Sequence, residues 1–187
     1  MTSFTRGRPD SSPSRFSCSS MASQPSQSIA CGARSRTHSK VGSSTGSEFT
    51  GFIADRYTTL EPTRERILAT AVTARWRHAG AESDWGESFA ATRALLLETF
   101  ATTHSLSLQQ TLHAMATAVL EARPEIVEVR MSMPNKHHFA VDLTPFGLDN
   151  PNEVFHADDR PYGLIEAAVH AAGAPPAGPA WDPYPLL

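Results

Sequence analysis

The order in which hydrophobic periodicities follow one another between residues 67 and 143 constrains the fold more than any other feature of this chain. Residues 67–76 alternate as in a strand, two runs then repeat at helical spacing, and residues 127–133 and 138–143 return to strand-like alternation. The order strand, helix, helix, strand, strand is typical of an antiparallel sheet that packs helices against it. The pattern therefore predicts an α+β fold.

Both helices carry a recognisable start signal. Asp84 is followed three residues later by Glu87, and Ser107 by Gln110, which is the spacing of a capping box, while Pro124 ends the second run. The apolar residues at helical spacing are Trp85, Phe89, Leu96, Leu97 and Phe100 in the first run, and Leu108, Leu112, Met115, Ala116, Val119 and Leu120 in the second. These signals predict two consecutive helices that begin after Asp84 and Ser107.

A last strand is predicted within 154–169, although the alanine-rich segment 166–172 fits a short helix equally well. Beyond it, residues 173–187 contain five prolines without a usable period and are expected to form an extended, Pro-rich tail. We therefore take 49–172 as one folded domain and 173–187 as a tail.

Residues 1–48 differ in composition from this domain. Serine recurs throughout, and Asp10 is the one acidic residue before Glu48. Such a segment buries too little apolar surface to offset its ordering entropy, so we expect a disordered leader. Its arginine- and serine-rich composition also resembles an organelle transit peptide, but it shows no clear amphipathic period.

Bulk composition excludes several classes of function. Sixteen basic and 19 acidic residues give a net charge of -3, which is too weak a field to attract nucleic acid or an anionic membrane surface. No apolar run reaches the length of a membrane span. Cys18 and Cys31 lack partners at metal-ligand spacing, and the chain ends in Pro185-Leu186-Leu187 rather than a Ser-Lys-Leu peroxisomal signal. We expect a soluble, cytoplasmic protein with no nucleic-acid or membrane partner.

Several short motifs occur in a fixed order along the chain. They are GSEFTGF at 46–52, RILAT at 66–70, TARWR at 73–77, PFGL at 145–148 and NEVF at 152–155. The most specific is MPNKHHF at 133–139. Together they resemble the C-terminal half of urate oxidase, a two-domain enzyme of the T-fold type. The resemblance implies a T-fold-like antiparallel sheet with two helices packed on one face.

The resemblance also implies a pocket for urate, a flat purine anion. Phe49 would stack on the ring, Arg66 would present a forked pair of N–H donors, and Gln109 would be the opposing amide arm beside Leu108. Because Leu108 and Gln109 follow the predicted cap Ser107, their backbone N–H groups could also face an anion. Without the resemblance, Phe49 fits a core residue, and Arg66 and Gln109 fit solvated surface residues.

Asn135 and His137 are the residues that the resemblance identifies as catalytic. Two residues apart in an extended segment, they are expected to point to the same side. In the resembling enzymes the Asn holds dioxygen and later the attacking water, and the His belongs to a proton relay, roles that suit an amide and an imidazole. Surface hydrogen bonding is the plain alternative for both.

We expect neither a metal nor an organic cofactor. His137, His138, His156 and His170 lack the spacing of a metal site. The resemblance implies that deprotonated urate itself reduces dioxygen, so the enzyme ionises, orients and desolvates the reactants. The products would be 5-hydroxyisourate and hydrogen peroxide.

Two expected parts of such an enzyme cannot be found in residues 1–48. The family's Lys/Thr base belongs to its N-terminal half and reaches the pocket across a subunit interface. Residues 31–40 also lack the apolar alternation of the first strand of the module, which would leave an exposed sheet edge. Three functions stay open: a urate oxidase that assembles as a homo-oligomer or with a complementing N-terminal half, a non-catalytic T-fold subunit that binds a purine or only assembles, and a fragment with a foreign leader.

Overall fold

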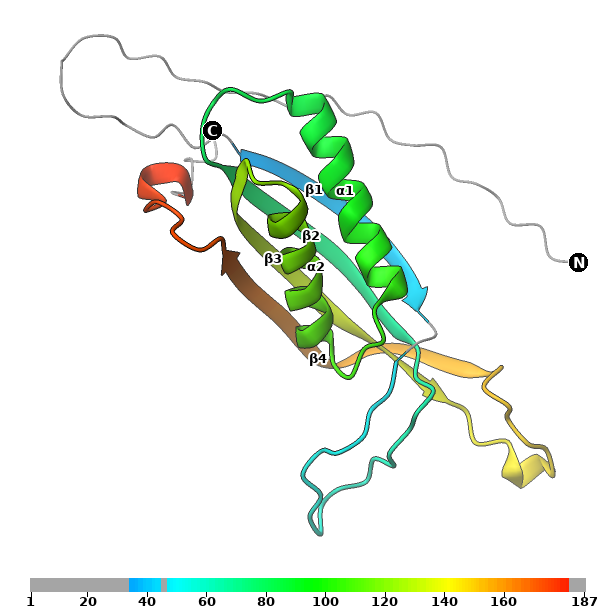
Figure 1. The fold of residues 1–187 in the computed structure, drawn as a ribbon. Coiled ribbons are helices and arrows are strands. Elements are labelled where there is room, and N and C mark those ends of the chain that lie inside the picture. Colours follow the sequence, from blue (N-terminus) through cyan, green and yellow to red (C-terminus); the bar gives the residue numbers. More distant parts are fainter. Residues whose placement is uncertain (1–33, 45–46, 182–187) are drawn as a thin grey trace, which may run out of the picture.

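The computed structural model describes residues 34–44 and 47–181 and shows one four-stranded antiparallel sheet with two helices on one face (Figure 1). The strands lie side by side in chain order, β1, β2, β3, β4. Their bounds are Arg34–Ser44, Leu68–His78, Ile126–Ala140 and Phe155–His170. Helix α1 spans Trp85–Thr102 and α2 spans Leu108–Ala122, both between β2 and β3. The predicted α+β, T-fold-like architecture is confirmed.

Both predicted helix caps are confirmed. The Asp84 side chain accepts from the Glu87 N–H at 3.0 Å, and the Ser107 hydroxyl accepts from the Gln110 N–H at 3.2 Å. Gln110 in turn accepts from the Leu106 N–H at 2.9 Å, so this end of α2 is held from both sides. Because these donors have no partner inside the helix, the caps fix where each helix begins.

A single hydrophobic core lies between the sheet and the two helices. Alternate residues of β2 and β3 face the helices, because side chains of a strand point to its two faces in turn. Each member is at most 3 % exposed, and the main contributors are Val72, Ala74, Trp76, Leu96, Phe100, Leu112, Met115, Val119, Val129, Met131 and Met133. Trp76 also packs against Phe89 of α1, with ring centroids 5.7 Å apart. This core fixes the sheet and the start of α2 relative to each other.

Strand β1 is the main correction to the sequence-based expectation. The segment Arg34–Ser44 falls inside the predicted leader, yet it pairs antiparallel with β2 from Arg34 opposite Arg77 to Ser44 opposite Leu68. The expectation that the first strand is missing is therefore wrong. Backbone hydrogen bonds hold an edge strand whatever its side-chain pattern, so the absence of apolar alternation did not exclude pairing. The predicted disorder of residues 1–33 lies outside the described residues.

The C-terminal part of the domain is more regular than predicted. The two β-like runs at 127–133 and 138–143 belong largely to one strand, β3, and β4 continues through His170, so the alternative helix at 166–172 is wrong. The predicted tail turns back into a short 3-10 helix, Gly178–Trp181, in which Ala180 is buried. Arg77 donates to the Pro175 carbonyl at 2.9 Å and the Arg130 guanidinium lies 4.3 Å from the Trp181 ring centroid. The first half of the tail thus packs on the sheet.

Two long connections leave the sheet at the end where α2 begins (Figure 1). One runs from residue 47 to β2, and the other joins β3 to β4 through the 3-10 helix Thr144–Phe146. Asn150 closes the second connection, since its amide donates to the carbonyls of Val141 and Val154 at 2.9 and 2.8 Å. Among the described residues, neither helix has the length and hydropathy to cross a bilayer. The end with the long connections carries the candidate site.

Candidate functional site

A short two-stranded ladder brings Phe49 and Arg66 together. Phe49 exchanges two backbone hydrogen bonds with Thr63, at 2.7 and 2.9 Å, and the Arg66 N–H donates to the Ser47 carbonyl at 2.7 Å. The long connection between them therefore closes on itself like a hairpin. The Arg66 guanidinium carbon lies 5.6 Å from the Phe49 ring centroid. Two of the residues predicted for the pocket are thus neighbours in space, although 17 positions apart in the sequence.

The Arg66 guanidinium has an unsatisfied donor. Its Nε–H donates to the Ser47 hydroxyl at 3.0 Å, whereas its Nη2 is buried and has no hydrogen-bond partner among the described residues. Burial lowers the pKa of Arg66 from its ordinary value. Buried polar groups are nearly always paired, so an unpaired guanidinium nitrogen indicates a place where an acceptor from outside the described residues can bind.

One face of the Phe49 ring is already covered within the chain. Its ring stacks on Phe52 with centroids 4.5 Å apart and planes 18° apart, so Phe52 covers one face of the ring. A planar ligand would have to approach the ring elsewhere. Offset stacking of a second flat group on the same cluster suits aromatic geometry.

Leu108 and Gln109 lie in the first turn of α2, but their side chains have different environments. Leu108 is 3 % exposed and belongs to the core, so its backbone amide is the part that a ligand could reach. Gln109 is exposed. Ser105, just before the cap, accepts from the Glu48 N–H at 2.9 Å through its carbonyl, and its bridge to Ser47 ties this turn to the Phe49 segment.

Asn135 and His137 lie on β3 at the same end of the sheet. Asn135 pairs with Thr70 of β2, and the pairing with β4 shifts between Asn135, opposite Gly163, and His137, opposite Asp158. His137 Nε2 lies 2.9 Å from the Pro161 carbonyl. A carbonyl can only accept, so Nε2 carries the hydrogen and Nδ1 of a neutral ring is left as an acceptor. A group that can accept a proton there fits the predicted relay.

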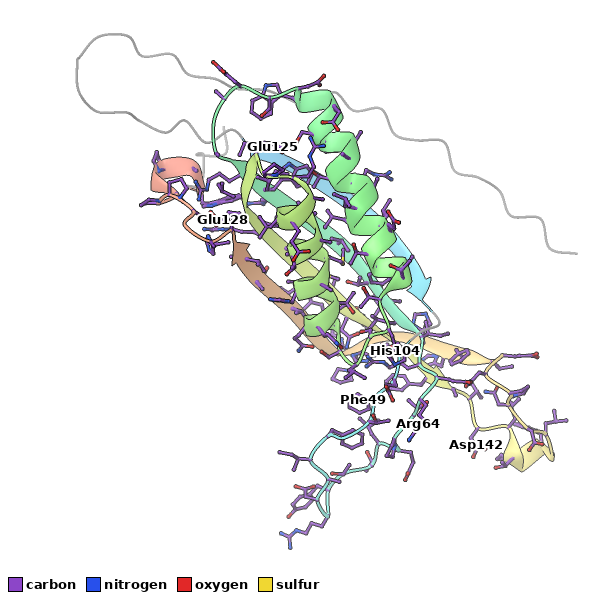
Figure 2. All side chains as sticks on the ribbon, in the orientation of Figure 1. Phe49, Arg64, His104, Glu125, Glu128 and Asp142 are labelled. Carbon is purple, nitrogen blue, oxygen red and sulfur yellow. The ribbon has the colours of Figure 1, made fainter. Side chains whose placement is uncertain are left out.

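The structure joins some of the predicted site residues directly and others through the fold. Phe49 and Arg66 are in contact, and the Ser47–Ser105 bridge connects them to the first turn of α2. Asn135 lies opposite Thr70 of β2, but no hydrogen bond or ring contact in the described part of the chain joins Asn135 or His137 to Phe49 or Arg66. Asn152 of the β3–β4 connection donates to Glu65 at 2.8 Å, one residue before Arg66. Figure 2 shows Phe49, Arg64 and His104 together at this end, with Asp142 on the neighbouring connection.

Sequence reasoning missed the polar residues that hold the site together. Ser47 and Ser105 are fully buried, and the Thr111 hydroxyl donates to the Ser105 hydroxyl at 2.7 Å. Glu48 accepts from His104 at 3.0 Å, and the hydrogen bond from His104, with help from Thr50, lowers the pKa of Glu48. Small polar residues in a serine-rich stretch carry no periodic signal, so the sequence could not identify Ser47 as a contact of Arg66. Among the described residues, no group of three or more His, Cys, Asp or Glu side chains is placed to hold a metal ion.

The fold and the composition of this site define a class. A four-stranded antiparallel sheet with two helices between its second and third strands is the T-fold arrangement, here with a cationic and aromatic cluster at one end. The uricase family model matches residues 34–166, and its match includes β1. The chain belongs to the uricase family.

Individual relatives agree with this assignment. The uricase of Arthrobacter globiformis is 60% identical over 139 residues, which cover 74% of this chain and 46% of the relative. The uricase of Dictyostelium discoideum is 37% identical over 125 residues, or 67% of this chain and 44% of the relative. The chain therefore spans about half the length of the curated relatives it matches.

Solved structures agree as well. The crystal structure of the Arthrobacter globiformis uricase superposes with a TM-score of 0.70 at 56% identity, covering 80% of this chain and 51% of that chain. A uricase from Bacillus fastidious gives a TM-score of 0.57 at 23% identity, over 74% of this chain and 44% of that one. The second likeness shows the fold alone.

Proposed function

We propose that this chain supplies the C-terminal half of a urate oxidase pocket. The reaction is the oxidation of urate by dioxygen, with water, to 5-hydroxyisourate and hydrogen peroxide in purine breakdown. Urate gives up two electrons and two protons, dioxygen takes them to become hydrogen peroxide, and water adds to the oxidised ring. No metal or prosthetic group is needed, because the urate anion is the reductant.

The buried, unpaired Nη2 of Arg66 beside Phe49 is the observation that supports this proposal most strongly. A flat anion with oxygen and nitrogen acceptors along one edge would satisfy that donor while its ring lies against the Phe49 cluster. The backbone N–H groups at the start of α2 and the exposed amide of Gln109 would bind the opposite edge. Urate has this combination of shape, charge and acceptors.

Asn135 and His137 would handle dioxygen and protons. The Asn135 amide can donate to a bound peroxide and orient a water molecule. His137, with Nε2 directed at the Pro161 carbonyl, keeps Nδ1 available to accept a proton. Their position on β3, next to the strand that follows Arg66, supports placing them above the bound ring.

The remaining half of the pocket would come from another chain. Curated uricases are about twice as long as the matched region. We therefore propose that the chain acts in a homo-oligomer or with a complementing N-terminal half, in the cytoplasm, and that this half brings the base that starts the proton relay. A non-catalytic subunit that binds a purine, or only assembles with a full-length relative, is the second candidate.

Decay of the near-ultraviolet absorbance of urate tests the proposal. The purified chain should consume urate only after the N-terminal half of the Arthrobacter globiformis uricase is added. Arg66→Ala should abolish most of that turnover, whereas Arg64→Ala, an exposed neighbour in the same connection, should preserve it. Urate binding without turnover under complementation would favour the non-catalytic subunit. Absence of both binding and turnover would overturn the proposal.

A further inference from the structure

We infer that Ser47 is a positioning residue that sets the direction of the Arg66 guanidinium toward a planar anion. The inference rests on the proposed function and adds a residue to it. Ser47 contacts Arg66 twice: its carbonyl accepts from the Arg66 N–H at 2.7 Å, and its hydroxyl accepts from Arg66 Nε–H at 3.0 Å. The backbone and the side chain of Arg66 are thus both held by one residue.

Ser47 sets the orientation of the Arg66 guanidinium plane. A guanidinium is planar, so a hydrogen bond at Nε fixes the plane in which both Nη groups lie. With Nε held by Ser47, the buried and unpaired Nη2 points in a set direction. A ligand then meets a donor that is already ordered, and less entropy is lost when the hydrogen bond forms.

Ser47 is itself held in place by buried polar neighbours. Ser47 is fully buried, and it forms a parallel bridge with Ser105, which is fully buried as well. The Ser105 hydroxyl donates to the Ser107 carbonyl at 2.9 Å and accepts from Thr111 at 2.7 Å. Ser107 caps α2. Ser47 therefore connects Arg66 to the turn that carries Gln109. The distance between Arg66 and Gln109, the two residues proposed to bind urate, is thereby held constant.

The contacts of the Ser47 hydroxyl favour a positioning role over a purely structural one. The backbone ladder through Phe49, Thr63 and Arg66 does not need that hydroxyl. Among the described residues, the Ser47 hydroxyl forms a hydrogen bond with the Arg66 guanidinium, and no carboxylate pairs with that guanidinium. Losing the hydroxyl would free the guanidinium to rotate while the ladder keeps its shape.

A double-mutant cycle on the full-length chain tests the inference. Urate is titrated calorimetrically without oxygen, with the complementing N-terminal half present, into the unmodified chain, Ser47→Ala, Arg66→Lys and the double variant. Arg66→Lys keeps the positive charge but lacks the Nε–H. Ser47→Ala should weaken urate binding by about five- to tenfold, because the Arg66 side chain must then be ordered when urate binds. In the Arg66→Lys background the same change should have less than about a twofold effect, because the contact no longer exists.

Ser88→Ala serves as the matched control. Ser88 is also a buried serine with hydrogen-bonded partners, but it lies at the other end of the molecule, so it should lower the unfolding temperature without changing urate affinity. Equal weakening by Ser47→Ala in both backgrounds would mean that Ser47 acts other than through Arg66. Unchanged affinity in folded Ser47→Ala would also overturn the inference.

A measurement that needs no urate separates this inference from the proposed function. In ¹⁵N-labelled protein the Arg66 Nε–H signal, assigned by its absence from the Arg66→Lys spectrum, should exchange slowly with water and should lose that protection in Ser47→Ala. An unprotected signal in the unmodified chain would overturn the positioning role. If the complemented chain fails to bind urate but the protection is present and depends on Ser47, the proposed function fails and the geometry of Ser47 and Arg66 stands.

Discussion

An arginine is buried at one end of the sheet and another is partly buried at the other end, and the two have different hydrogen-bond partners. Arg77 is 2 % exposed, its Nε donates to Glu128 at 2.9 Å and its Nη2 donates to the Pro175 carbonyl. Arg66, at the other end, has one neutral hydroxyl for its Nε and nothing in the described chain for its Nη2. Arg77 is therefore paired within the fold, whereas the unpaired Nη2 of Arg66 supports the proposal that Arg66 binds an external anion.

Charged side chains at the end with Arg77 form a network of ion pairs and hydrogen bonds with one another. Glu128 is fully buried and accepts from Arg77 and from Arg130, at 2.9 and 2.7 Å. Burial acts to raise the pKa of Glu128, but hydrogen bonds from Trp181, Arg130 and Arg77 outweigh it and hold that pKa below the ordinary value. The packed part of the C-terminal tail covers this network. A buried carboxylate that is this well paired belongs to the structure of the domain.

The largest effect should come from breaking that network. Glu128→Ala leaves Arg77 buried without its carboxylate and should lower the free energy of unfolding by about 3–5 kcal/mol. Urea denaturation followed by tryptophan fluorescence measures it, and Glu166→Ala, an exposed glutamate on β4, is the control. A loss no larger than that of the control would show that the end with Arg77 does not depend on this ion pair.

Arg66→Ala should reduce urate affinity more than it reduces stability. The substitution removes one hydrogen bond, from Nε–H to the Ser47 hydroxyl, and no ion pair, so it should lower stability far less than Glu128→Ala does. Urate affinity should fall by about 1.5–3 kcal/mol, the value of a hydrogen bond to a charged group. Calorimetry and denaturation on the same preparation measure both quantities. A large loss of stability with unchanged affinity would place Arg66 in the same structural class as Arg77.

Sequence patterns predicted the parts of the fold that depend on local rules. The caps at Asp84 and Ser107, the two helices and the core strands follow from periodicity and from unsatisfied helix donors, and all are present. Strand β1 depends on pairing with β2, a contact that its own composition does not encode. The packing of Trp181 on Arg130 is a long-range contact of the same kind.

The candidate site also has some features that the sequence predicted and others that depend on long-range contacts. Motif resemblance marked Phe49, Arg66, Leu108, Gln109, Asn135 and His137, whose pocket roles stay predictions. Helical periodicity already placed Leu108 on the apolar face of its helix, and its side chain is buried in the core. Neither signal could show that Phe52 covers one face of Phe49. The contact between Ser47 and Arg66 could not be predicted from the sequence, because local spacing does not encode a hydrogen bond between residues 19 positions apart.

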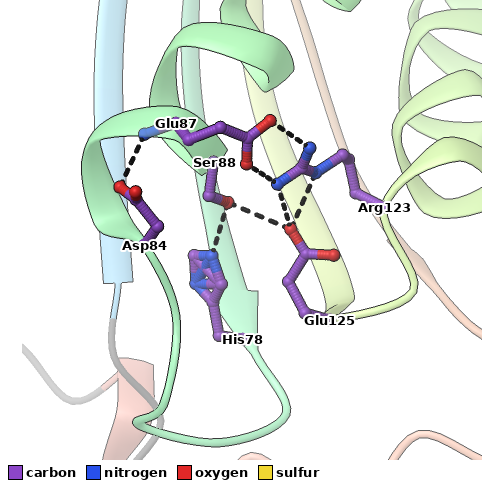
Figure 3. A network of polar contacts seen from close by, with 6 residues as sticks. All are labelled: His78, Asp84, Glu87, Ser88, Arg123 and Glu125. Atoms are coloured by element: carbon purple, nitrogen blue, oxygen red, sulfur yellow. Dashed lines mark hydrogen bonds and ion pairs between the residues drawn. The ribbon is translucent and has the colours of Figure 1, made fainter.

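The pH dependence of stability should also come from the end with Arg77. His78 is buried beside Ser88, which bonds it at 2.9 Å and Glu125 at 3.2 Å, and Arg123 binds Glu125 and Glu87 (Figure 3). Burial lowers the pKa of His78 below 6.5, since it outweighs the opposing effect of Glu125 and adds to that of Arg123. The unfolded chain then takes up the proton more readily, so stability is lost as pH falls through 6.5.

Thermal unfolding at about pH 7.5 and about pH 5.5 measures this effect, in a window where histidine is the side chain that ordinarily titrates. The unfolding temperature should be lower at the acidic pH. His78→Gln, which keeps a hydrogen-bonding side chain but cannot titrate, should remove most of the difference. A drop of the same size in His78→Gln would assign the pH dependence to other groups.

The smallest effect should come from the exposed ion pair at the end with Arg66. His104 lies 3.0 Å from Glu48, but its side chain is 61% exposed, so water screens the attraction and competes for both partners. Glu48→Gln keeps an acceptor for His104 and should leave the unfolding midpoint unchanged within error. Because Glu48 sits between Ser47 and Phe49, its backbone bond to Ser105 should survive the change. Denaturation of Glu48→Gln beside Glu128→Ala makes the comparison direct: a loss in Glu48→Gln that approached the loss in Glu128→Ala would mean that the end with Arg66 also depends on a paired charge.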